Sequence, residues 1–405
     1  MNNPPIPEHG NALTVGWMQQ ALSAGGGDFP TIKDIVVEDV GAGSGTMSQV
    51  LRCTMTYRDD AAQAPESVVI KLSSSDKTSL RIAKILSMYK REYLCFRQLA
   101  PQMRIGLPAL VYGDFEDTSH RFVMVLEDLC DMEKVDQITG ASATRAKRVI
   151  RGVAELHGQF WNKLEQPPLS DFFASAGLPR RWLSPLLYLV FLAPCLERFG
   201  NLFSDRMRSL AEAYGPRLFD HMNGLATGPQ TLTHGDFRLD NMFFGAADTD
   251  DFTVIDWQVA GLAKDGLYDV AYFMVTSVPT EVRRRIERTA LEEYHSIVCS
   301  MGAKDFTFEE CWRRYRQNML GMLVPCICAC GGLDMTNQRV RMLGETMVQR
   351  TLAAIEDLDA DEFLPTRNGF LTTTNVLSIL SSCAYKAYKL AYTLYKTLAG
   401  KSPRT

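Results

Sequence analysis

The stretch from Thr231 to Gln258 reads TLTHGDFRLDNMFFGAADTDDFTVIDWQ, and the fold that we expect follows mainly from it. In it, His234, Asp236 and Asn241 follow the pattern H-x-D-x-x-x-x-N. This is the spacing of the catalytic loop in phosphoryl-transfer enzymes of the kinase type. The apolar run that ends at Asp256 predicts a buried strand, and the turn residues between loop and strand predict a hairpin.

The side chains of this stretch are those that phosphoryl transfer requires. A hydroxyl is a poor nucleophile, so a carboxylate has to orient it and accept its proton, and Asp236 is the candidate. Asn241 and Asp256 offer hard oxygen ligands that suit Mg²⁺ beside a triphosphate. We expect His234 to brace the loop backbone. Arg238 is expected to neutralise the moving phosphoryl group, and an ordinary surface arginine is an equal alternative.

Two other interpretations of the stretch stay open at this point. An H-x-D pair with nearby acids also fits a metal-dependent hydrolase, and it fits a polar loop between strands. The full H-G-D-x-x-x-x-N pattern, followed by an apolar strand that ends in Asp, is more specific than the pair alone.

The composition is that of a globular protein with a sizeable core. The chain has 405 residues, enough for two or three domains or lobes, with 46% hydrophobic and 22% charged residues. A net charge of -4 implies neither a nucleic acid nor an anionic membrane as partner. We find no secretion signal and no apolar run of membrane-spanning length, so no stable membrane insertion is expected. The ten cysteines lack framework spacing, which favours reduced thiols and a cytoplasmic location.

The first part of the chain has the pattern of a nucleotide-binding lobe. Strands are expected at 32–40 and 47–57, on either side of a glycine-rich turn. In a kinase, such a turn covers the ATP phosphates with backbone amides, which here would come from Gly43, Ser44, Gly45 and Thr46. Taken alone, a plain hairpin is the simpler interpretation of this turn.

A lysine lies near the end of the apolar strand expected at 67–72, and a lysine on a buried strand needs a partner. Lys71 is expected to hold the α- and β-phosphates while it pairs with Glu92. Glu92 lies among apolar positions on the helix expected at 77–99. The alternatives are a snorkelling edge lysine and an exposed glutamate.

The next two strands, expected at 108–115 and 121–126, lead to an acidic segment. An apolar strand that turns acidic is where a hinge between two lobes would run, and we expect Glu127 and Leu129 to contact the adenine edge there. The predicted lobes are therefore 1–128, with 1–10 disordered, and 129–405.

The rest of the chain is predicted to be mainly helical and to form the catalytic and acceptor-binding lobe. Cys326, Cys328 and Cys330 alternate in an apolar segment, and core packing is preferred because no His or further Cys pair completes a metal set. Long helices are expected at 142–164, 280–300, 308–331, 336–358 and 373–398.

In their order along the chain, these motifs resemble the choline/aminoglycoside phosphotransferase superfamily, a branch of the protein-kinase-like fold, and most closely its ecdysteroid-kinase-like (CHK) members. The resemblance rests on VVIK with Lys71, on Glu92, and on VLEDL, HGD with Asn241, DWQ and YDVAY, all within residues 30–280. It implies an ATP-dependent small-molecule O-kinase in which Asp236 is the base, Asn241 and Asp256 bind the metal, and Lys71 binds phosphate. The glycine turn departs from the family pattern. DWQ in place of the DFG of protein kinases argues against a protein substrate.

We therefore expect an α+β, two-lobed protein-kinase-like fold, with a small, mostly antiparallel N-terminal sheet carrying one helix and a large helical C-terminal lobe. The expected reaction transfers the γ-phosphoryl group of ATP, with Mg²⁺, to a small organic alcohol. Apolar segments favour a hydrophobic one, such as a sterol-like, terpenoid or aromatic alcohol. The alternatives are an aminoglycoside- or choline-type kinase of a cationic acceptor, a protein kinase, a non-catalytic nucleotide-binding module and a metal-dependent hydrolase. The expected state is a monomer or homodimer.

Overall fold

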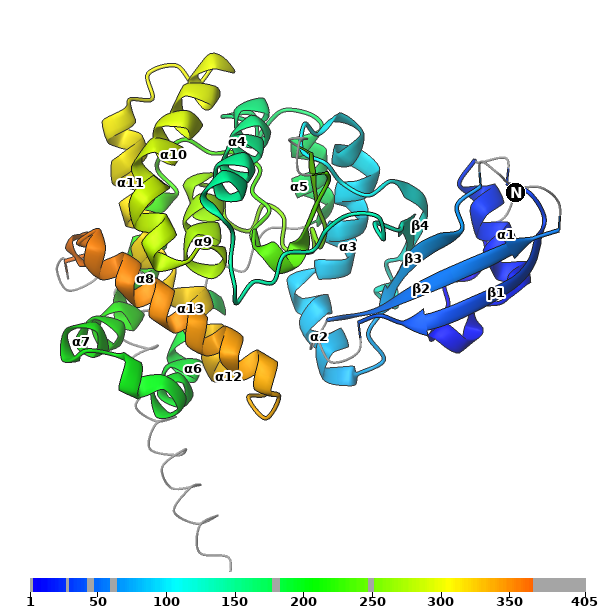
Figure 1. The fold of residues 1–405 in the computed structure, drawn as a ribbon, viewed down its shortest axis with the longest axis horizontal. Coiled ribbons are helices and arrows are strands. Elements are labelled where there is room, and N and C mark those ends of the chain that lie inside the picture. Colours follow the sequence, from blue (N-terminus) through cyan, green and yellow to red (C-terminus); the bar gives the residue numbers. More distant parts are fainter. Residues whose placement is uncertain are drawn as a thin grey trace, which may run out of the picture. The chain divides into compact units, whose positions relative to one another are not determined.

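The computed structural model describes residues 3–26, 29–41, 47–58, 64–176, 183–246 and 251–366 of the chain (Figure 1). The chain divides into two compact units. The first contains Met1–Val135, Arg151–Pro179 and Thr231–Ala263, and the second contains Asp136–Ile150, Arg180–Gln230 and Lys264–Thr405. All the candidate site residues that the structure describes belong to the first unit. The lobe boundary at residue 128 stays a prediction.

An antiparallel five-stranded sheet is the framework of the first unit. Its strands are β1 (Ile32–Asp39), β2 (Ser48–Tyr57), β3 (Ser67–Ser73), β4 (Leu110–Glu116) and β5 (Arg121–Glu127), in the order β1-β2-β3-β5-β4. In the register of the sheet, Lys71 on the central strand lies opposite Val50 of β2 and Met124 of β5. Because side chains alternate along a strand, Lys71 lies on the face opposite to Ile70 and Leu72.

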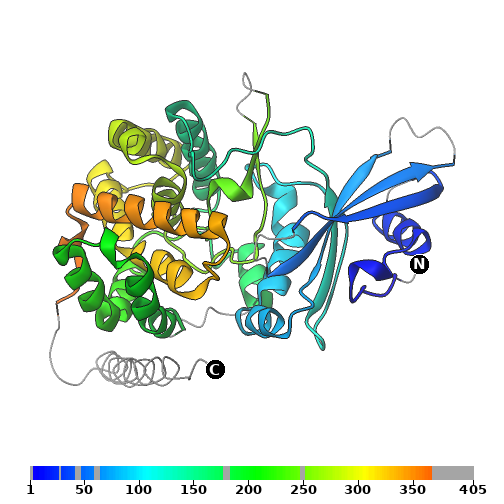
Figure 2. The same ribbon diagram turned by 60° about the horizontal axis from the view of Figure 1, so that its bottom comes forward.

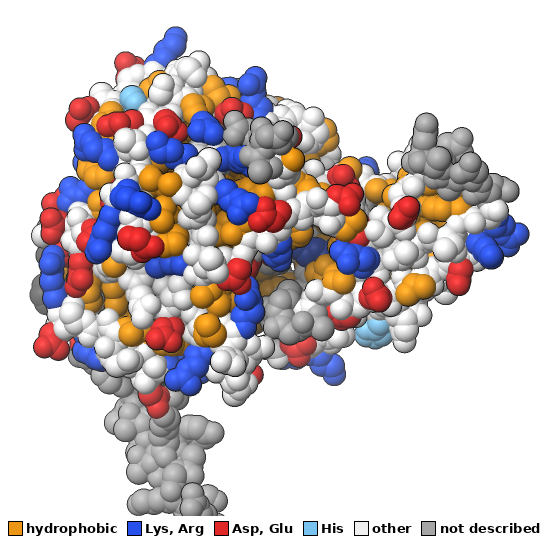
Figure 3. All heavy atoms as spheres, viewed as in Figure 1, with side chains coloured by type: hydrophobic (Ala, Val, Ile, Leu, Met, Phe, Trp, Pro, Cys, Tyr) orange, Lys and Arg blue, Asp and Glu red, His pale blue; other side chains and the backbone are white. Residues whose placement is uncertain are grey.

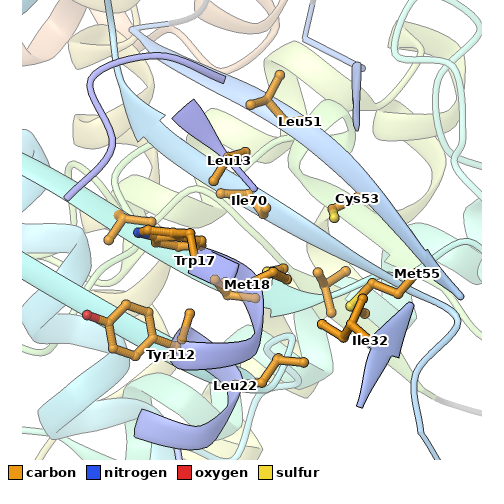
Figure 4. Packing of buried hydrophobic residues seen from close by; sticks show 14 of the residues in the cluster. Leu13, Trp17, Met18, Leu22, Ile32, Leu51, Cys53, Met55, Ile70 and Tyr112 are labelled. Atoms are coloured by element: carbon orange, nitrogen blue, oxygen red, sulfur yellow. The ribbon is translucent and has the colours of Figure 1, made fainter. Parts of the chain in front are cut away.

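Helix α1, which spans Val15–Ala24, covers one face of this sheet (Figure 2). Thr14 caps the helix, because its hydroxyl oxygen accepts a hydrogen bond from the backbone N–H of Trp17 at 3.1 Å. Trp17 and Met18 belong to a buried apolar cluster that includes Ile70 of the sheet (Figure 4). The same cluster contains Leu22, Leu51, Cys53, Met55, Val68, Leu72, Val123 and Val125. Since α1 buries this face, Lys71 is left on the other one.

Residues 3–10 differ from the prediction of a disordered start. The indole N–H of Trp17 donates a hydrogen bond to the carbonyl oxygen of Pro5 at 2.7 Å, and Pro4 and Pro7 are buried. Proline restricts the backbone of an unfolded chain, so ordering this segment loses less conformational entropy than composition suggests. The sequence pattern favoured disorder because it does not reveal the indole that holds the segment.

The helix expected at 77–99 is interrupted at Ser87. Helix α2 spans Lys77–Leu86, helix α3 spans Met88–Leu94, and a π-helical turn follows at Cys95–Leu99. Ser87 has a left-handed backbone with φ 54°, which ends α2. After the break, the ring of Tyr89 stacks on Phe122 of β5 with centroids 4.5 Å apart. This contact fixes α3, the helix that carries Glu92, against the sheet.

The stretch from Thr231 to Gln258 contains a hairpin, as its turn residues predict. Strands β6 (Met242–Phe244) and β7 (Phe252–Val254) pair antiparallel. β7 is also bound to the segment before β4, because the N–H of Val254 donates to the carbonyl oxygen of Gly106 at 2.8 Å. A Cβ atom at Gly106 would lie 2.6 Å from the carbonyl oxygen of Phe252, so this close approach requires glycine.

Helices make up most of the remaining described chain. They are α4 (Ala143–Gln159), α5 (Leu169–Ala176), α6 (Leu183–Phe199), α7 (Asp205–Tyr214), α8 (Leu218–Leu225), α9 (Leu267–Ser277), α10 (Thr280–Ser300), α11 (Phe308–Gly321), α12 (Leu323–Gly332) and α13 (Gln338–Asp357). The single helix expected at 308–331 is divided between α11 and α12. Pro325 explains the division, because it has no N–H for the carbonyl group of Gly321 and its ring clashes there. The helix expected at 373–398 lies outside the described residues.

Within the described ranges, no helix is both long enough and apolar enough to cross a membrane. The thiols of Cys326 and Cys330 on α12 are fully buried in the second unit, where burial raises the pKa of Cys328 to about 12. In the same described ranges, no group of three or more His, Cys, Asp or Glu side chains could hold a metal ion. By their burial, Cys326 and Cys330 are core residues, whereas Cys328 is partly exposed. On the face shown in Figure 3, basic and acidic side chains are intermixed.

Candidate active site

Lys71 joins two carboxylates in the first unit. Its Nζ atom lies 2.7 Å from Oε1 of Glu92 and 2.7 Å from Oδ1 of Asp256. Glu92 comes from α3 and Asp256 from the chain just after β7, so one ammonium group connects the sheet, the helix and the hairpin. The Glu92 side chain is 1% exposed. Neither a snorkelling lysine nor an exposed glutamate is therefore found here.

Burial and the neighbouring charges together set the pKa values of Lys71 and Glu92. Burial raises the pKa of Glu92 to about 7, against the opposing effect of the Lys71 charge. Burial by itself would lower the pKa of Lys71, but the charges of Asp256 and Glu92 outweigh it and raise that pKa. Lys71 therefore stays charged at neutral pH, whereas Glu92 gains or loses its charge close to neutrality.

For the ATP-dependent reaction that the sequence predicts, we expect kcat/KM for ATP to fall as the pH falls through about 7, because protonated Glu92 can no longer form an ion pair with Lys71. The pKa of an unburied glutamate is about 4.5, so this fall in kcat/KM occurs well above the pH at which an exposed glutamate would cause one. The measurement is kcat/KM against pH, which reports groups of the free enzyme. In Glu92→Gln, kcat/KM should be low and should not change with pH near neutrality. The same fall in that variant would show that another group causes it.

The loop that carries Asp236 is held by its own side chains. Nδ2 of Asn241 donates to the carbonyl oxygen and to Oδ2 of Asp236, each at 2.9 Å. Nε of Arg238 lies 3.1 Å from Oδ1 of Asp236, and its Nη1 lies 3.0 Å from Oδ2 of Asp240. Arg238 is thus engaged with two carboxylates of the loop and is no ordinary surface arginine. Asp240, to which sequence reasoning gave no role, is its second partner.

His234 holds the backbone on either side of this loop. Its Nε2 lies 2.9 Å from the carbonyl oxygen of Ile255, and its Nδ1 accepts a hydrogen bond from the N–H of Asp236 at 3.2 Å. A carbonyl oxygen only accepts, so these contacts place the proton on Nε2. Gly235 has φ 86°, and a Cβ atom there would lie 2.7 Å from the carbonyl oxygen of Val259. Only glycine fits this position without strain.

Asp256 has a strained backbone that its neighbours hold in place. Its φ of 67° is left-handed, a conformation that costs a residue other than glycine about 1 kcal/mol. Behind it, the buried indole of Trp257 donates to the carbonyl oxygen of Val254 at 3.0 Å. Gln258 donates to Oδ2 of Asp256 at 3.1 Å. Each carboxylate oxygen of Asp256 thus accepts a hydrogen bond from a different residue, Oδ1 from Lys71 and Oδ2 from Gln258.

The acidic segment after β5 is tied to neighbouring strands. Oε2 of Glu127 accepts a hydrogen bond from the N–H of Ala109 at 3.0 Å. Asp128 accepts from Nε and Nη2 of Arg52 on β2, at 2.7 and 3.2 Å, and from the hydroxyl of Ser67 on β3 at 2.7 Å. The carbonyl oxygen of Leu129 accepts from Met132. Since the side chains of Glu127 and Asp128 are engaged, any contact to an adenine edge would come from the backbone.

Not every predicted site residue can be placed. Gly43, Ser44, Gly45 and Thr46 lie outside the described residues. Two supporting residues, Arg91 and Asp128, were given no role by sequence reasoning. The one local signal for Arg91 is that a second charged residue stands next to Glu92 on a largely apolar helix.

Comparisons with known proteins bear on the family and the fold of this chain. The model of the ecdysteroid kinase-like family matches residues 42–301. A choline kinase from Cryptosporidium parvum is 10% identical, with a TM-score of 0.52 over 82% of this chain and 92% of that one. An ethanolamine kinase from Plasmodium vivax is 12% identical, with a TM-score of 0.47 over 81% and 83%. No curated protein matches the sequence. At these identities the likeness to the choline kinase shows the fold alone, and the expected α+β kinase-like fold is confirmed.

Proposed function

The chain belongs to the ecdysteroid kinase-like family, and we propose that it is an ATP-dependent phosphotransferase that moves the γ-phosphoryl group to the hydroxyl of a small organic alcohol. The observation that carries the proposal is the ion-pair set in which Lys71 joins Glu92 and Asp256. The N–H of Ile255, beside Asp256, donates to the carbonyl oxygen of Asn241 at 3.0 Å, which links this set to the Asp236 loop. Nucleotide-dependent phosphoryl transfer needs this combination of parts.

In the proposed reaction, Asp236 orients the acceptor hydroxyl and takes its proton as the oxygen attacks the γ-phosphorus. The bond between that phosphorus and the β,γ-bridging oxygen breaks, and ADP leaves with the electron pair. Asn241 and Arg238 both donate to the Asp236 carboxylate, so its direction is set before the acceptor arrives. Arg238 also brings a positive charge next to the attacked group.

Asn241 and Asp256 fit Mg²⁺ by their donor chemistry. Mg²⁺ prefers oxygen ligands and is usually held by one or two carboxylates together with substrate phosphates. Nδ2 of Asn241 faces Asp236, so its amide oxygen points away from that carboxylate. When bound, the ion would neutralise charge on the phosphates. Lys71 would hold the α- and β-phosphates, with Glu92 keeping its ammonium group in place.

The rival functions leave some of these residues without a role. A nucleotide-binding module without catalysis has no need of a carboxylate oriented as Asp236 is. A metal-dependent hydrolase of phosphoesters has no need of a buried lysine between two carboxylates. The segment DWQ, which has no counterpart of the DFG glycine, argues against a protein kinase.

For the acceptor, we propose a hydrophobic alcohol of the sterol-like, terpenoid or aromatic kind, because the family is named for a steroid. The apolar segments that suggested this class from sequence are 183–194 and 318–330, and Tyr188 and Met319 in them are fully buried in the second unit. They are core residues there, so they add no support. A cationic amino alcohol or aminoglycoside is the alternative outcome of the test.

The test is ADP release with Mg²⁺ and ATP across sterols, terpenoid and aromatic alcohols, amino alcohols, sugars and aminoglycosides. The proposal predicts release that depends on one hydrophobic class. Release with amino alcohols instead would replace the acceptor class and keep the reaction. Phosphate release from phosphoesters without ATP would overturn the proposed reaction.

A further inference from the structure

A buried arginine lies beside Glu92 on α3. The whole of Arg91 is 1% exposed, and the residue precedes the carboxylate that pairs with Lys71. An arginine is seldom buried to this extent unless specific partners hold its guanidinium group. Arg91 is therefore a buried charged residue that takes no part in the ion pairs of Lys71 and needs an explanation of its own.

The guanidinium group of Arg91 contacts backbone from two other parts of the first unit. Nη1 donates to the carbonyl oxygen of Ala260 at 3.0 Å, and Nη2 donates to that of Ala176 at 3.5 Å. The ring of Phe172 on α5 lies below the group, with its centroid 5.7 Å from the guanidinium carbon. The planar group thus ties α3 to α5 and to the segment after Asp256.

The contact with Ala260 matters most for the site. Ala260 lies four residues after Asp256, in the segment whose N–H groups at 260 and 261 bond to Trp257 and Thr233. Glu92 and Asp256 both need to lie within hydrogen-bond distance of one Lys71 ammonium group. Arg91 is next to Glu92 in sequence and donates to the chain near Asp256, so this hydrogen bond can set the separation between the two carboxylates.

We propose that Arg91 is a positioning residue, which fixes α3 to the segment after Asp256 and thereby holds Glu92 at Lys71. The inference rests on the proposed function, because it assigns Arg91 to the nucleotide-binding set of that function. Beyond that function, we expect the effect of Arg91 on the site to be transmitted through Glu92. Lysine cannot replace it fully, because a single ammonium group does not reproduce the planar fork that reaches two carbonyl oxygens.

The test is a double-mutant cycle of Arg91→Met and Glu92→Gln, read as kcat/KM for ATP and as the Kd of the non-hydrolysable analogue AMP-PNP with Mg²⁺. Arg91→Met alone should lower kcat/KM about 100-fold, the size expected when a supporting residue misplaces a catalytic group by about 1 Å. In the Glu92→Gln background the same change should cost less than about fivefold, since its route is already lost. Arg91→Lys should lie between the wild type and Arg91→Met.

Arg97→Met is the matched control, because this arginine is exposed on the helical turn that continues α3. It should leave both readings unchanged. Equal losses from Arg91→Met with and without Glu92 would overturn the proposal, since a purely structural role acts in both backgrounds. If Arg91→Met does not fold, Arg91→Lys replaces it in the cycle under the same criterion. If the wild type binds AMP-PNP but transfers no phosphoryl group, the proposed function fails, and the binding arm still decides the role of Arg91.

Discussion

Replacement of Asp236 by asparagine lowers kcat by about 1,000-fold while the Kd for ATP stays within about twofold. Asparagine keeps the shape of the side chain, so the loop retains its backbone contacts with His234 and Asn241. It cannot accept the proton of the acceptor hydroxyl, which is the task assigned to this carboxylate. The loss therefore falls on the chemical step and spares nucleotide binding. Steady-state kinetics and ATP titration on the same preparation check both parts.

Asp240→Asn is the control for this variant. Asp240 belongs to the same loop and pairs with Arg238 at 3.0 Å, but it has no proposed part in proton transfer. Its replacement should lower kcat by less than about tenfold, as expected for an indirect contact. Asp236→Asn with kcat close to that of the wild type would remove the general base from the account. Equal losses in both variants would mean that the charge of the loop matters and the position of the carboxylate does not.

Replacement of Asp256 by asparagine lowers kcat by about 1,000-fold at a fixed Mg²⁺ concentration and raises the Mg²⁺ concentration needed for half-maximal rate. The change removes the charged ligand proposed for the ion and one of the two carboxylates at Lys71. Asparagine retains one side-chain oxygen that can bind the ion, so the rate of the variant should recover in part when Mg²⁺ is added. Rate against Mg²⁺ concentration is the measurement.

Gln258→Ala is the control for that change. Gln258 touches only Oδ2 of Asp256 among the site carboxylates, and its loss frees that oxygen without removing charge. We expect its Mg²⁺ curve to shift by less than about threefold. A normal Mg²⁺ curve in Asp256→Asn would show that Asp256 is no metal ligand.

The parts of the site that sequence predicted are those with short-range signals. The apolar strand at Lys71 and the helical spacing around Glu92 are local patterns, and β3 and α3 form where they predict. The hairpin before Asp256 follows from its turn residues in the same way. Strand alternation then places Lys71 on the face that α1 does not cover.

The parts that sequence did not predict depend on contacts between distant segments. The break at Ser87 is accompanied by the stacking of Tyr89 on Phe122, which belongs to a strand formed more than thirty residues later. The order of residues 3–10 depends on the indole of Trp17. The roles of Arg91 and Asp128 depend on carbonyl and side-chain partners that no periodic pattern reveals. The division between α11 and α12 is an exception, because Pro325 is a local signal for it in the sequence.

The most direct test of the proposed reaction follows the γ-phosphoryl group itself. The enzyme is incubated with Mg²⁺, ATP labelled with ¹⁸O in the γ-phosphoryl oxygens, and the acceptor that gives the greatest ADP release. Mass spectrometry then measures the label in the products. The account predicts a phosphomonoester of the acceptor that carries three labelled oxygens, with the bridging oxygen supplied by the alcohol, and no such product from Asp236→Asn. Label found in inorganic phosphate alone, at the same rate with and without acceptor, would contradict it.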